Sequence, residues 1–502
     1  MADLLPEQWF QRLTGMFAAP TRPPWQDNLP RPALLPNVYG STPLHLSRYW
    51  TPRHRFLDTL WSYRVGDPPL PQLQDEYADI FREVLRKARS NYAPMCVNAM
   101  LDRLELQDVS TLADGDTDGD AMAAAIMDET GFAAVAKDLW DFTLSMGEGY
   151  GMVVPGGPNS AKLSNGQPAP SIHAIDPRRC IGVPDLNNPL RLRAALVYQY
   201  DPILFEYTAN MFLPGVKWTI PRAADGMSWD EDNLTSEAVE GLDELGGIPI
   251  VRFENLNGLG EYEPHLDLLD RINDTTLQRI IGFWYQALRQ RAMFGDEDED
   301  NEDDPEAPPG EPVDWDQLLK AGPGAMWRFP KDFTMWESQQ TDFGPFVNAK
   351  RADVQEFAAV TSTPLHLITP DAANGSAEGA GLMRESLTSK VRDRRSRWEP
   401  SLKLLWRIVF ATAGAADRGT GMRLNWGPIE FRTLAEKASA SSQAAGTLSL
   451  EDRCEQIWEM SPDDTARNIQ RLTADSLLNL PAPTGGQNPQ QPPPSAVTDS
   501  GD

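Results

Sequence analysis

Residues 376–412 limit what this chain can fold into more than any other part of the sequence. Their apolar side chains recur three, four or seven positions apart, a spacing that keeps them on one face of an α-helix. They are Met383, Leu387, Val391, Trp398, Leu402, Leu405 and Val409. At 1.5 Å per residue this helix would be roughly 55 Å long, beyond the usual length in a globular domain. We expect a rod that one subunit cannot cover, so that identical copies flank it.

The ends and the middle of this predicted helix carry further information. Ser376 can cap its first turn, and Pro400 is expected to kink it because proline supplies no amide proton. The middle concentrates basic residues around a single acid, Asp393; they are Lys390, Arg392, Arg394, Arg395 and Arg397. Two interpretations stay open, a solvated helix face or a contact with an acidic neighbouring subunit or a polyanion.

Two more helices are predicted before this rod. Residues 264–294 carry an apolar stripe over a length of about 45 Å, and residues 345–360 form a shorter helix that breaks at 361–364. A run poor in bulky side chains then extends to Gly381. Between the two helices, nine of the eleven residues at 296–306 are acidic, which favours a solvated loop over a metal site.

The middle of the chain has the pattern of a sheet. Short β-rich runs separated by turn residues predict a mainly antiparallel sheet beside the preceding helices, and therefore an α+β fold. The runs are residues 171–175, 180–183, 194–200, 206–213, 216–220 and 248–253. Helical patterns cover residues 44–106 and 121–146, and a strand at 423–426 is followed by helices at 433–445, 450–459 and 462–479.

The charge and the composition argue against several classes of protein. The net charge of −28 argues against a sequence-specific DNA-binding protein, since phosphate binding depends on Lys and Arg. An acidic surface could still let a duplex slide, or could only aid solubility. No window resembles a membrane span or a signal peptide, so we expect a soluble protein that is not secreted by that route. Three scattered cysteines predict neither a disulfide framework nor a zinc site and fit a reducing compartment.

No group of residues forms a catalytic motif. Residues 114–120 imitate a calcium loop, but Ala125 stands where the bidentate glutamate belongs, so an acidic helix-capping turn is favoured. The glycines of 147–151 do not match a nucleotide-binding loop, and the five histidines are far apart. The cluster of Arg48, Arg53, His54 and Arg55 is interpreted as a solvated face. We therefore expect no enzyme, no cofactor and no metal.

Several short motifs, in order, resemble the portal proteins of tailed bacteriophages of the SPP1 type. They lie at residues 91–94, 102–104, 147–151, 175–177, 247–250, 322–327, 361–365 and 374–378. Each is weak alone, whereas their order and spacing over most of residues 44–412 are specific. The acidic insert at 296–306 and the glycines at 379 and 381 depart from the family pattern, which bears on where the loop before the rod ends.

The resemblance implies a phage portal fold with a helical stem and a helical C-terminal crown. Its parts would be an N-terminal arm (1–43), an α+β wing (44–262), a stem helix (263–294), a clip with the acidic loop (295–344), a second stem helix (345–360), a tunnel loop (361–381), a long kinked helix (382–413), the crown (414–480) and a disordered tail (481–502). The DNA tunnel loop would consist of Asp371, Ala372, Ala373, Asn374, Gly375 and Ser376, and the clip would include Gly322, Pro323, Gly324 and Trp327. Glycine would let this loop change shape against a moving duplex.

The implied function is a portal, or head–tail connector, that forms a ring of twelve subunits at one capsid vertex. DNA would enter during packaging and leave during ejection through its channel. The implied partners are further copies of the chain, the terminase packaging motor, the major capsid and scaffolding proteins, a head–tail adaptor protein and double-stranded DNA passing non-specifically, with no membrane. The protein would lie in the virion, and in the host cytoplasm during assembly. Two alternatives stay open: a non-ring minor capsid or scaffold component, and a soluble cytosolic enzyme without a recognisable motif.

Overall fold

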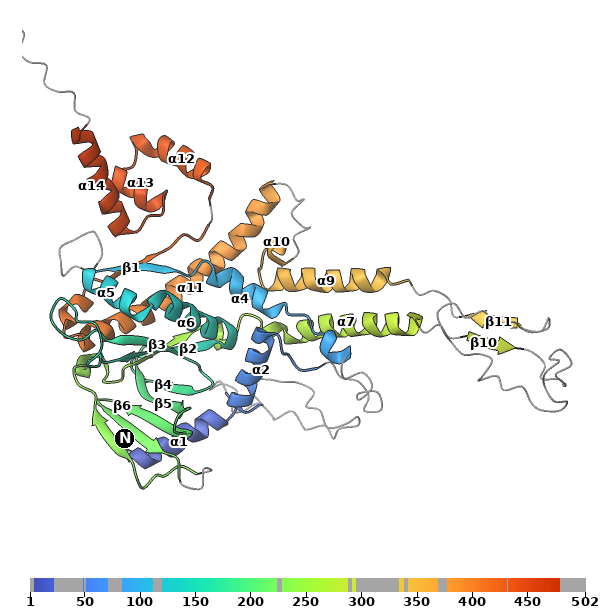
Figure 1. Ribbon diagram of the computed structural model, residues 1–502, viewed down its shortest axis with the longest axis horizontal. Helices are drawn as coiled ribbons and strands as arrows, with labels where there is room; N and C mark the ends of the chain where they lie inside the picture. The colour runs from blue at the N-terminus through green and yellow to red at the C-terminus, as the bar shows by residue number, and fades with distance from the viewer. Residues whose placement is uncertain are drawn as a thin grey trace, which may run out of the picture. The chain divides into compact units, whose positions relative to one another are not determined.

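The computed structural model describes residues 4–21, 48, 51–70, 84–111, 120–223, 228–287, 291–294, 334–337, 342–368, 377–430 and 432–478. The chain divides into two compact units. The first comprises Met1–Leu57, Asn98–Gly260 and Glu385–Asp502, and the second comprises Asp58–Val97 and Glu261–Arg384. Figure 1 shows their helices and strands along the chain.

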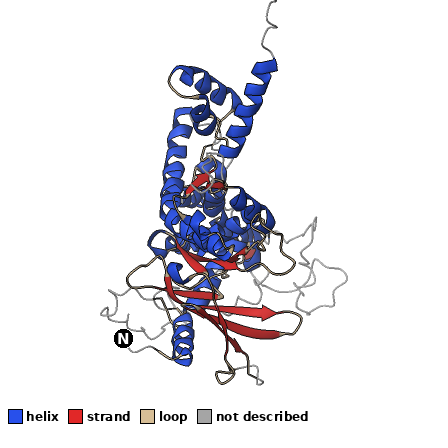
Figure 2. Cartoon of the chain, turned by 90° about the vertical axis from the view of Figure 1, so that its left-hand side faces the viewer, coloured by secondary structure: helices blue, strands red, loops and turns tan. Residues whose placement is uncertain are grey.

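Two antiparallel sheets form the core of the first unit (Figure 2). One has the order β4-β5-β6-β7-β8 and the other the order β3-β2-β9. Their strands are β2 (Glu148–Val154), β3 (Ser171–Ile175), β4 (Cys180–Pro184), β5 (Leu192–Asp201), β6 (Glu206–Leu213), β7 (Val216–Pro221), β8 (Thr235–Ala238) and β9 (Ile250–Glu254). The predicted α+β class and all six predicted strands are confirmed, but the strands form two sheets rather than one. β8 was not predicted because all four of its residues are exposed and show no apolar alternation.

The two faces of β5 show how the sheets are layered. Ala195 and Val197 face a cluster that includes Tyr150 and Ile250 of the three-stranded sheet. The alternate residues Ala194 and Leu196 face the other way, onto the cluster that contains Phe10 and Leu13 of helix α1 (Pro6–Ala18). Because successive side chains of a strand point to opposite faces, β5 is covered on both sides.

Helix α1 makes the N-terminal segment part of this core. Phe10 and Leu13 are 1% and 0% exposed, and the Phe10 ring meets the edge of Trp229 at 5.9 Å between centroids. Gln11 donates a hydrogen bond to Glu231 at 2.9 Å. The described part of the predicted arm is therefore a packed helix. Residues 22–47 lie outside the described residues.

The helix predicted for residues 121–146 is two helices, so that prediction was wrong in its continuity. Helix α5 (Ala121–Thr130) ends at Gly131, whose φ of 60° is left-handed, and α6 (Phe132–Met146) begins directly after it. A glycine takes this conformation without the steric cost that a Cβ would add. At the start of α5, the Asp120 carboxylate accepts the amides of Met122 and Ala123 at 2.9 and 3.0 Å, which confirms the predicted capping at this residue.

The long helix α11 (Ala377–Thr412) is confirmed, together with its apolar stripe from Leu387 to Val409. The expectation that its own subunit cannot cover it was wrong for this part. Leu387, Val391, Leu402 and Val409 are at most 2% exposed, so the subunit itself covers this part of the stripe. The Trp398 ring stacks on Trp140 at 4.7 Å between centroids and 7° between planes.

The N-terminal boundary of α11 agrees with the helix predicted for residues 376–412 and differs from the loop boundary that the resemblance implies. The helix already includes Gly379 and Gly381, whereas the predicted tunnel loop extended to residue 381. A glycine inside a helix costs only about 1 kcal/mol relative to alanine, which a helix of this length tolerates. Pro400 lies inside the continuous helix, and the kink there remains a prediction.

The second unit contains the helix pair α7 (Leu266–Ala287) and α9 (Gly344–Val360), followed by the short α10 (Leu365–Ile368). Arg271, near the start of α7, binds Asp353 near the end of α9 at 3.0 Å. Phe283, near the end of α7, stacks on Phe343 at the start of α9 at 4.2 Å between centroids. The two helices are therefore antiparallel neighbours, and the predicted helix at 345–360 is confirmed.

The helix predicted for residues 264–294 is too long at both ends. Pro264 lies in the 3-10 turn Glu263–His265 before α7. After Ala287, β10 (Arg291–Phe294) pairs in antiparallel register with β11 (Thr334–Glu337). The backbone of Arg291–Phe294 thus forms its hydrogen bonds with another strand instead of with the preceding helical turn. Helix propensity is too weak to distinguish a helix from a strand here.

The remaining elements agree with the predicted C-terminal order. Strand β12 (Arg423–Trp426) matches the predicted strand and pairs with β1 (Leu106–Ser110), which the helical pattern up to residue 106 did not foresee. The three predicted C-terminal helices are confirmed as α12 (Leu434–Gln443), α13 (Leu450–Gln456) and α14 (Pro462–Leu478). The other described elements are α2 (Arg53–Val65), α4 (Ala93–Leu101) and the 3-10 turns Asp243–Leu245, Leu256–Gly258, Ala416–Gly419 and Ala444–Gly446.

Among the helices of the described residues, none has the length and apolar character needed to cross a membrane.

The docking of α1 can be measured by one substitution. Leu13→Ala should destabilise the chain by about 2–5 kcal/mol, because it leaves a cavity between α1 and the five-stranded sheet. Met16→Ala on the same helix is the matched control; Met16 is 48% exposed, and we expect a change within about 0.5 kcal/mol. Urea denaturation followed by circular dichroism would test both. Equal effects of the two variants would show that α1 is not packed on the sheet.

Candidate functional site

The predicted tunnel-loop residues Asp371–Ser376 and the predicted clip residues Gly322, Pro323, Gly324 and Trp327 lie outside the described residues. The structure does describe the chain on both sides of the loop. On the N-terminal side, α9 ends in a turn in which the Thr361 hydroxyl donates to Phe357 O at 2.7 Å and contacts the Thr363 hydroxyl at 2.9 Å. Ser362 in this turn has a φ of 54°, so the break predicted at 361–364 is confirmed.

The basic residues of α11 do not form one exposed face. Arg394 is 4% exposed and binds Asp393 at 2.6 Å. Arg395 donates to the carbonyls of Arg103 and Gly427, the latter at 2.8 Å, and its guanidinium lies 5.2 Å from the centre of the Trp426 ring. Burial, with the nearby Arg392 charge as the smaller cause, lowers the pKa of Arg395 to about 10, so it stays cationic at neutral pH.

The interpretation of the five bases as a solvated face is therefore wrong for Arg394 and Arg395, whose charges are engaged inside their own chain, whereas the alternative of partner contacts stays a prediction. Arg397 is 47% exposed and binds Asp393 at 2.8 Å, Arg392 is exposed, and Lys390 is partly buried. Hydrogen bonds and charges of Arg397 and Arg394 hold the pKa of Asp393 below its ordinary value. Only Arg392 and Arg397 offer exposed positive charge on this part of the helix.

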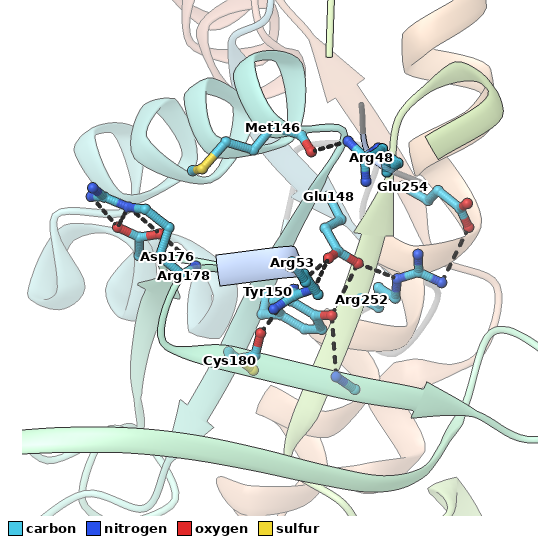
Figure 3. Close-up of polar contacts among 11 residues, drawn as sticks. Arg48, Arg53, Met146, Glu148, Tyr150, Asp176, Arg178, Cys180, Arg252 and Glu254 are labelled. Atoms are coloured by element: carbon cyan, nitrogen blue, oxygen red, sulfur yellow. Dashed lines mark hydrogen bonds and ion pairs between the residues drawn. The ribbon is translucent and has the colours of Figure 1, made fainter. Parts of the chain in front are cut away.

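A second group of charged residues lies deep in the first unit, around the carboxylate of Glu148 on β2 (Figure 3). Its Oε1 accepts hydrogen bonds from Arg53 Nη2 at 2.5 Å and Arg53 Nε at 3.1 Å. Its Oε2 accepts from Arg252 Nε at 3.0 Å and from the Tyr150 hydroxyl at 3.1 Å. We call Arg53, Glu148, Tyr150 and Arg252 the Glu148 cluster.

The Glu148 cluster joins the two sheets. Arg53 also donates to Cys180 O at 3.1 Å, and the Tyr150 hydroxyl accepts the Gly182 amide at 3.1 Å, so both contacts reach β4. Close by, Arg48 donates to Met146 O at 3.0 Å at the end of α6. The cluster thus holds together the first residue of α2, one strand of the five-stranded sheet and two strands of the other sheet.

The electrostatics of the cluster follow from burial and pairing. Burial alone would raise the pKa of Glu148, but the charges of Arg53 and Arg252 outweigh it and hold that pKa well below its ordinary value. Burial raises the pKa of the Tyr150 hydroxyl and of the Cys180 thiol, so both keep their protons at neutral pH. Glu148 is the anion of the cluster, and the neutral Tyr150 hydroxyl donates a hydrogen bond to it.

The prediction of a solvated face for Arg48, Arg53, His54 and Arg55 is wrong for its first two members, which are 8% and 5% exposed. Another part of the sequence could have indicated this cluster, namely the run Gly147-Glu-Gly-Tyr-Gly that leads into a strand. Period-2 alternation puts Glu148 and Tyr150 on one face between glycines. A Cβ on Gly147, whose φ is 85°, would lie 2.3 Å from Gly258 O, so this position requires glycine.

Over the described residues, no three histidine, cysteine, aspartate or glutamate side chains come together in a way that could hold a metal ion. The charged groups that do cluster connect helices and strands of the fold to one another.

Comparison with known families identifies the chain more closely. The family described as phage portal protein, SPP1 Gp6-like, matches residues 74–476. This match spans most of the sequence, and the chain belongs to this family of phage portal proteins. The resemblance predicted from the short motifs is confirmed. Among curated proteins, none matches this sequence.

Three solved particle structures contain similar chains. In the neck of the native GTA particle, computed with C12 symmetry, the identity is 13% and the TM-score 0.40 over 79% of this chain and 98% of the other. In the neck of the empty GTA particle, computed with C6 symmetry, the identity is 14% and the TM-score 0.41, with the same coverage. In the virion of the native gene transfer agent particle the identity is 14% and the TM-score 0.38, over 80% of this chain and 98% of the other.

Removing the carboxylate charge from the Glu148 cluster should be costly. Glu148→Gln leaves Arg53 and Arg252 buried without an anion, and we expect a loss of about 3–5 kcal/mol in the free energy of unfolding. Glu237→Gln is the matched control, because Glu237 pairs with Lys217 but is 73% exposed, and it should cost at most about 1 kcal/mol. Chemical denaturation would measure both, and similar values for the two variants would contradict the role assigned to Glu148.

The same carboxylate predicts an acid dependence. Its pKa is lower in the folded than in the unfolded chain, so its contribution is complete above the ordinary value of 4.5 and is lost as the pH falls below it. Between about pH 5 and pH 3 the wild-type chain should lose more stability than Glu148→Gln, which has no proton to take up there. Thermal unfolding across this range would show the two curves converging. Parallel curves would mean that Glu148 does not titrate in this way.

Proposed function

We propose that this chain is the subunit of a ring-shaped portal at one vertex of a tailed-phage capsid, through which DNA is packaged and later ejected. The observation that carries the proposal is membership of the SPP1 Gp6-like portal family over residues 74–476. The helix pair α7–α9 and the long helix α11 lie on either side of the predicted tunnel loop along the chain, in the order that the resemblance implies. In this proposal the protein is located in the virion.

Charge supports a role in which the duplex slides. The net charge of −28 leaves little means of displacing counterions from phosphates. Two of the five bases on α11, Arg394 and Arg395, are occupied within the chain, and Arg392 and Arg397 remain exposed. In the proposed ring these two would contact DNA or a neighbouring subunit, while the rest of the wall repels the duplex. The tunnel loop Asp371–Ser376 would be the moving contact.

The proposed partners follow from this role. They are eleven further copies of the chain, the terminase motor, the major capsid and scaffolding proteins, a head–tail adaptor and DNA held without sequence preference. The parts of the subunit would be the wing, stem, clip, tunnel loop and crown of the family.

The size and shape of the purified protein test the proposal directly. Light scattering should give a mass many times that of one chain, 55.8 kDa, and negative-stain images should show rings with a central hole. A mass of one chain would overturn the proposal in favour of a monomeric protein. Large assemblies without a hole would overturn it in favour of a non-ring capsid or scaffold component.

The tunnel loop can be tested by deletion. Removing residues 372–376 should leave rings intact, because the loop precedes α11 and contributes nothing to the buried stripe from Leu387 to Val409, but should block the filling of heads with DNA. Deleting residues 487–491 in the predicted disordered tail is a control of equal length that should leave filling unchanged. Packaged DNA protected from nuclease would measure both, and heads that fill normally after the first deletion would refute the loop assignment.

A further inference from the structure

The turn between β5 and β6 exposes three adjacent large apolar side chains. Ile203, Leu204 and Phe205 are 84%, 63% and 77% exposed. Single apolar residues on a surface are ordinary, but three in succession at the end of a hairpin form a contiguous patch of the kind found at protein contacts. We call these three residues the hairpin tip.

The hairpin tip has a defined shape. The Asp201 carboxylate accepts the amides of Ile203 at 2.7 Å and Leu204 at 3.1 Å, which fixes the start of the turn. Phe205 has a left-handed φ of 56°, a conformation that costs free energy in a bulky residue. Directly behind the turn, Tyr200 and Tyr207 stand opposite each other with ring centroids 4.6 Å apart. The chain therefore holds an apolar tip outward at a cost, and among the described residues no contact explains it.

The tip stands in an acidic setting. Asp201 and Glu206 occupy directly opposite positions on β5 and β6. Like charges placed opposite each other destabilise a strand pair. A cation brought close to them by another molecule would relieve this repulsion.

The opposite end of β5 has complementary chemistry. There the loop of residues 185–191, between β4 and β5, exposes Leu186 and Leu190, at 76% and 44%. Arg191 and Arg193 follow these leucines in the chain, and Asp185 precedes them. The Asp185 carboxylate is engaged by the amides of Asn187 and Asn188 at 2.8 and 3.0 Å. Arg191 and Arg193 are the cations beside this loop, and the Arg193 guanidinium lies 5.0 Å from the centre of the Trp9 ring. We call this loop, with the two arginines, the basic loop.

We propose that the hairpin tip of one subunit docks on the basic loop of the next copy of this chain, with apolar side chains in contact and Asp201 and Glu206 facing Arg191 and Arg193. Each subunit presents both surfaces at opposite ends of one strand (β5 and β6 are labelled in Figure 1), so the contact is head-to-tail. Such a contact repeats from copy to copy until a ring closes. This inference rests on the proposed ring and names one of its subunit contacts.

The size of the tip agrees with a contact inside a larger interface. Three side chains bury a few hundred Å² at most, whereas stable interfaces bury about 1,200–2,000 Å². The contact would therefore set the position of each subunit against the next, with other surfaces adding the remaining area.

Cysteine cross-linking of the full-length protein tests the contact. In the double variant L186C/L204C, oxidation should give a ladder of covalent multimers that collapses with reductant. A bond within one chain is excluded, because the ten residues of β5 separate the two sites by roughly 33 Å and a disulfide needs Cα atoms within about 7 Å. The native Cys96, Cys180 and Cys454 are buried. The single variants L186C and L204C are the controls and should stay uncross-linked.

Each outcome separates the hypotheses. Rings in the electron microscope together with a ladder support the contact. Rings without a ladder refute it and leave the proposed ring standing. Covalent dimers from L204C alone would mean a tip-to-tip contact and refute the head-to-tail arrangement. A mass of one chain in solution would refute the ring itself.

Charge reversal adds an independent test at low ionic strength. E206K should reduce the fraction of protein in rings, because it places a cation against Arg191 and Arg193, and R191E in the same chain should restore part of that fraction. A double variant no better than E206K would refute the charge pairing.

Discussion

One buried carboxylate held by two arginines fixes the first unit of this protein. Charges withdrawn from water are stable only when they are fully paired, and Glu148 uses both oxygens on Arg53, Arg252 and Tyr150. The donors come from the start of α2, from β9 and from β2 itself, and Tyr150 carries the connection on to β4. The relative position of the two sheets is thus set by hydrogen bonds of defined direction as well as by apolar packing, which is less selective about register.

The long helix α11 depends on this core for its position. Trp398 stacks on Trp140 of α6 and donates through its indole to Glu254 O at 2.9 Å, two residues beyond Arg252 on β9. From Leu387 to Val409 the helix is therefore embedded in its own subunit, and the predicted tunnel loop directly precedes the N-terminal end of the same helix along the chain.

The use of arginine inside the fold also bears on the outer surface. Arg48, Arg53 and Arg395 donate to carbonyls and a carboxylate inside the fold, and the buried Arg394 pairs with the partly exposed Asp393. The chain is already strongly acidic, and these internal contacts remove part of its positive charge from the surface. A channel built from such subunits would repel phosphates over most of its wall, which suits passage better than binding. The hairpin tip and the basic loop would then be the surfaces at which opposite charges of neighbouring subunits are in contact.

Local patterns along the chain predicted the α+β class, the six main strands, the helices at 345–360 and 376–412 and the family, because period-2 and period-3.6 patterns and the order of short motifs need no knowledge of distant contacts. They also pointed to the capping role of Asp120 and to the break after Val360. Three features became apparent from the three-dimensional fold alone: the pattern at 121–146 divides at Gly131, Arg291–Phe294 pairs as a strand, and Arg48 and Arg53 are buried. Arg53 and Glu148 stand 95 positions apart, and no local pattern identifies a partner at that distance, since the energy of a buried charge depends on what the rest of the fold brings beside it.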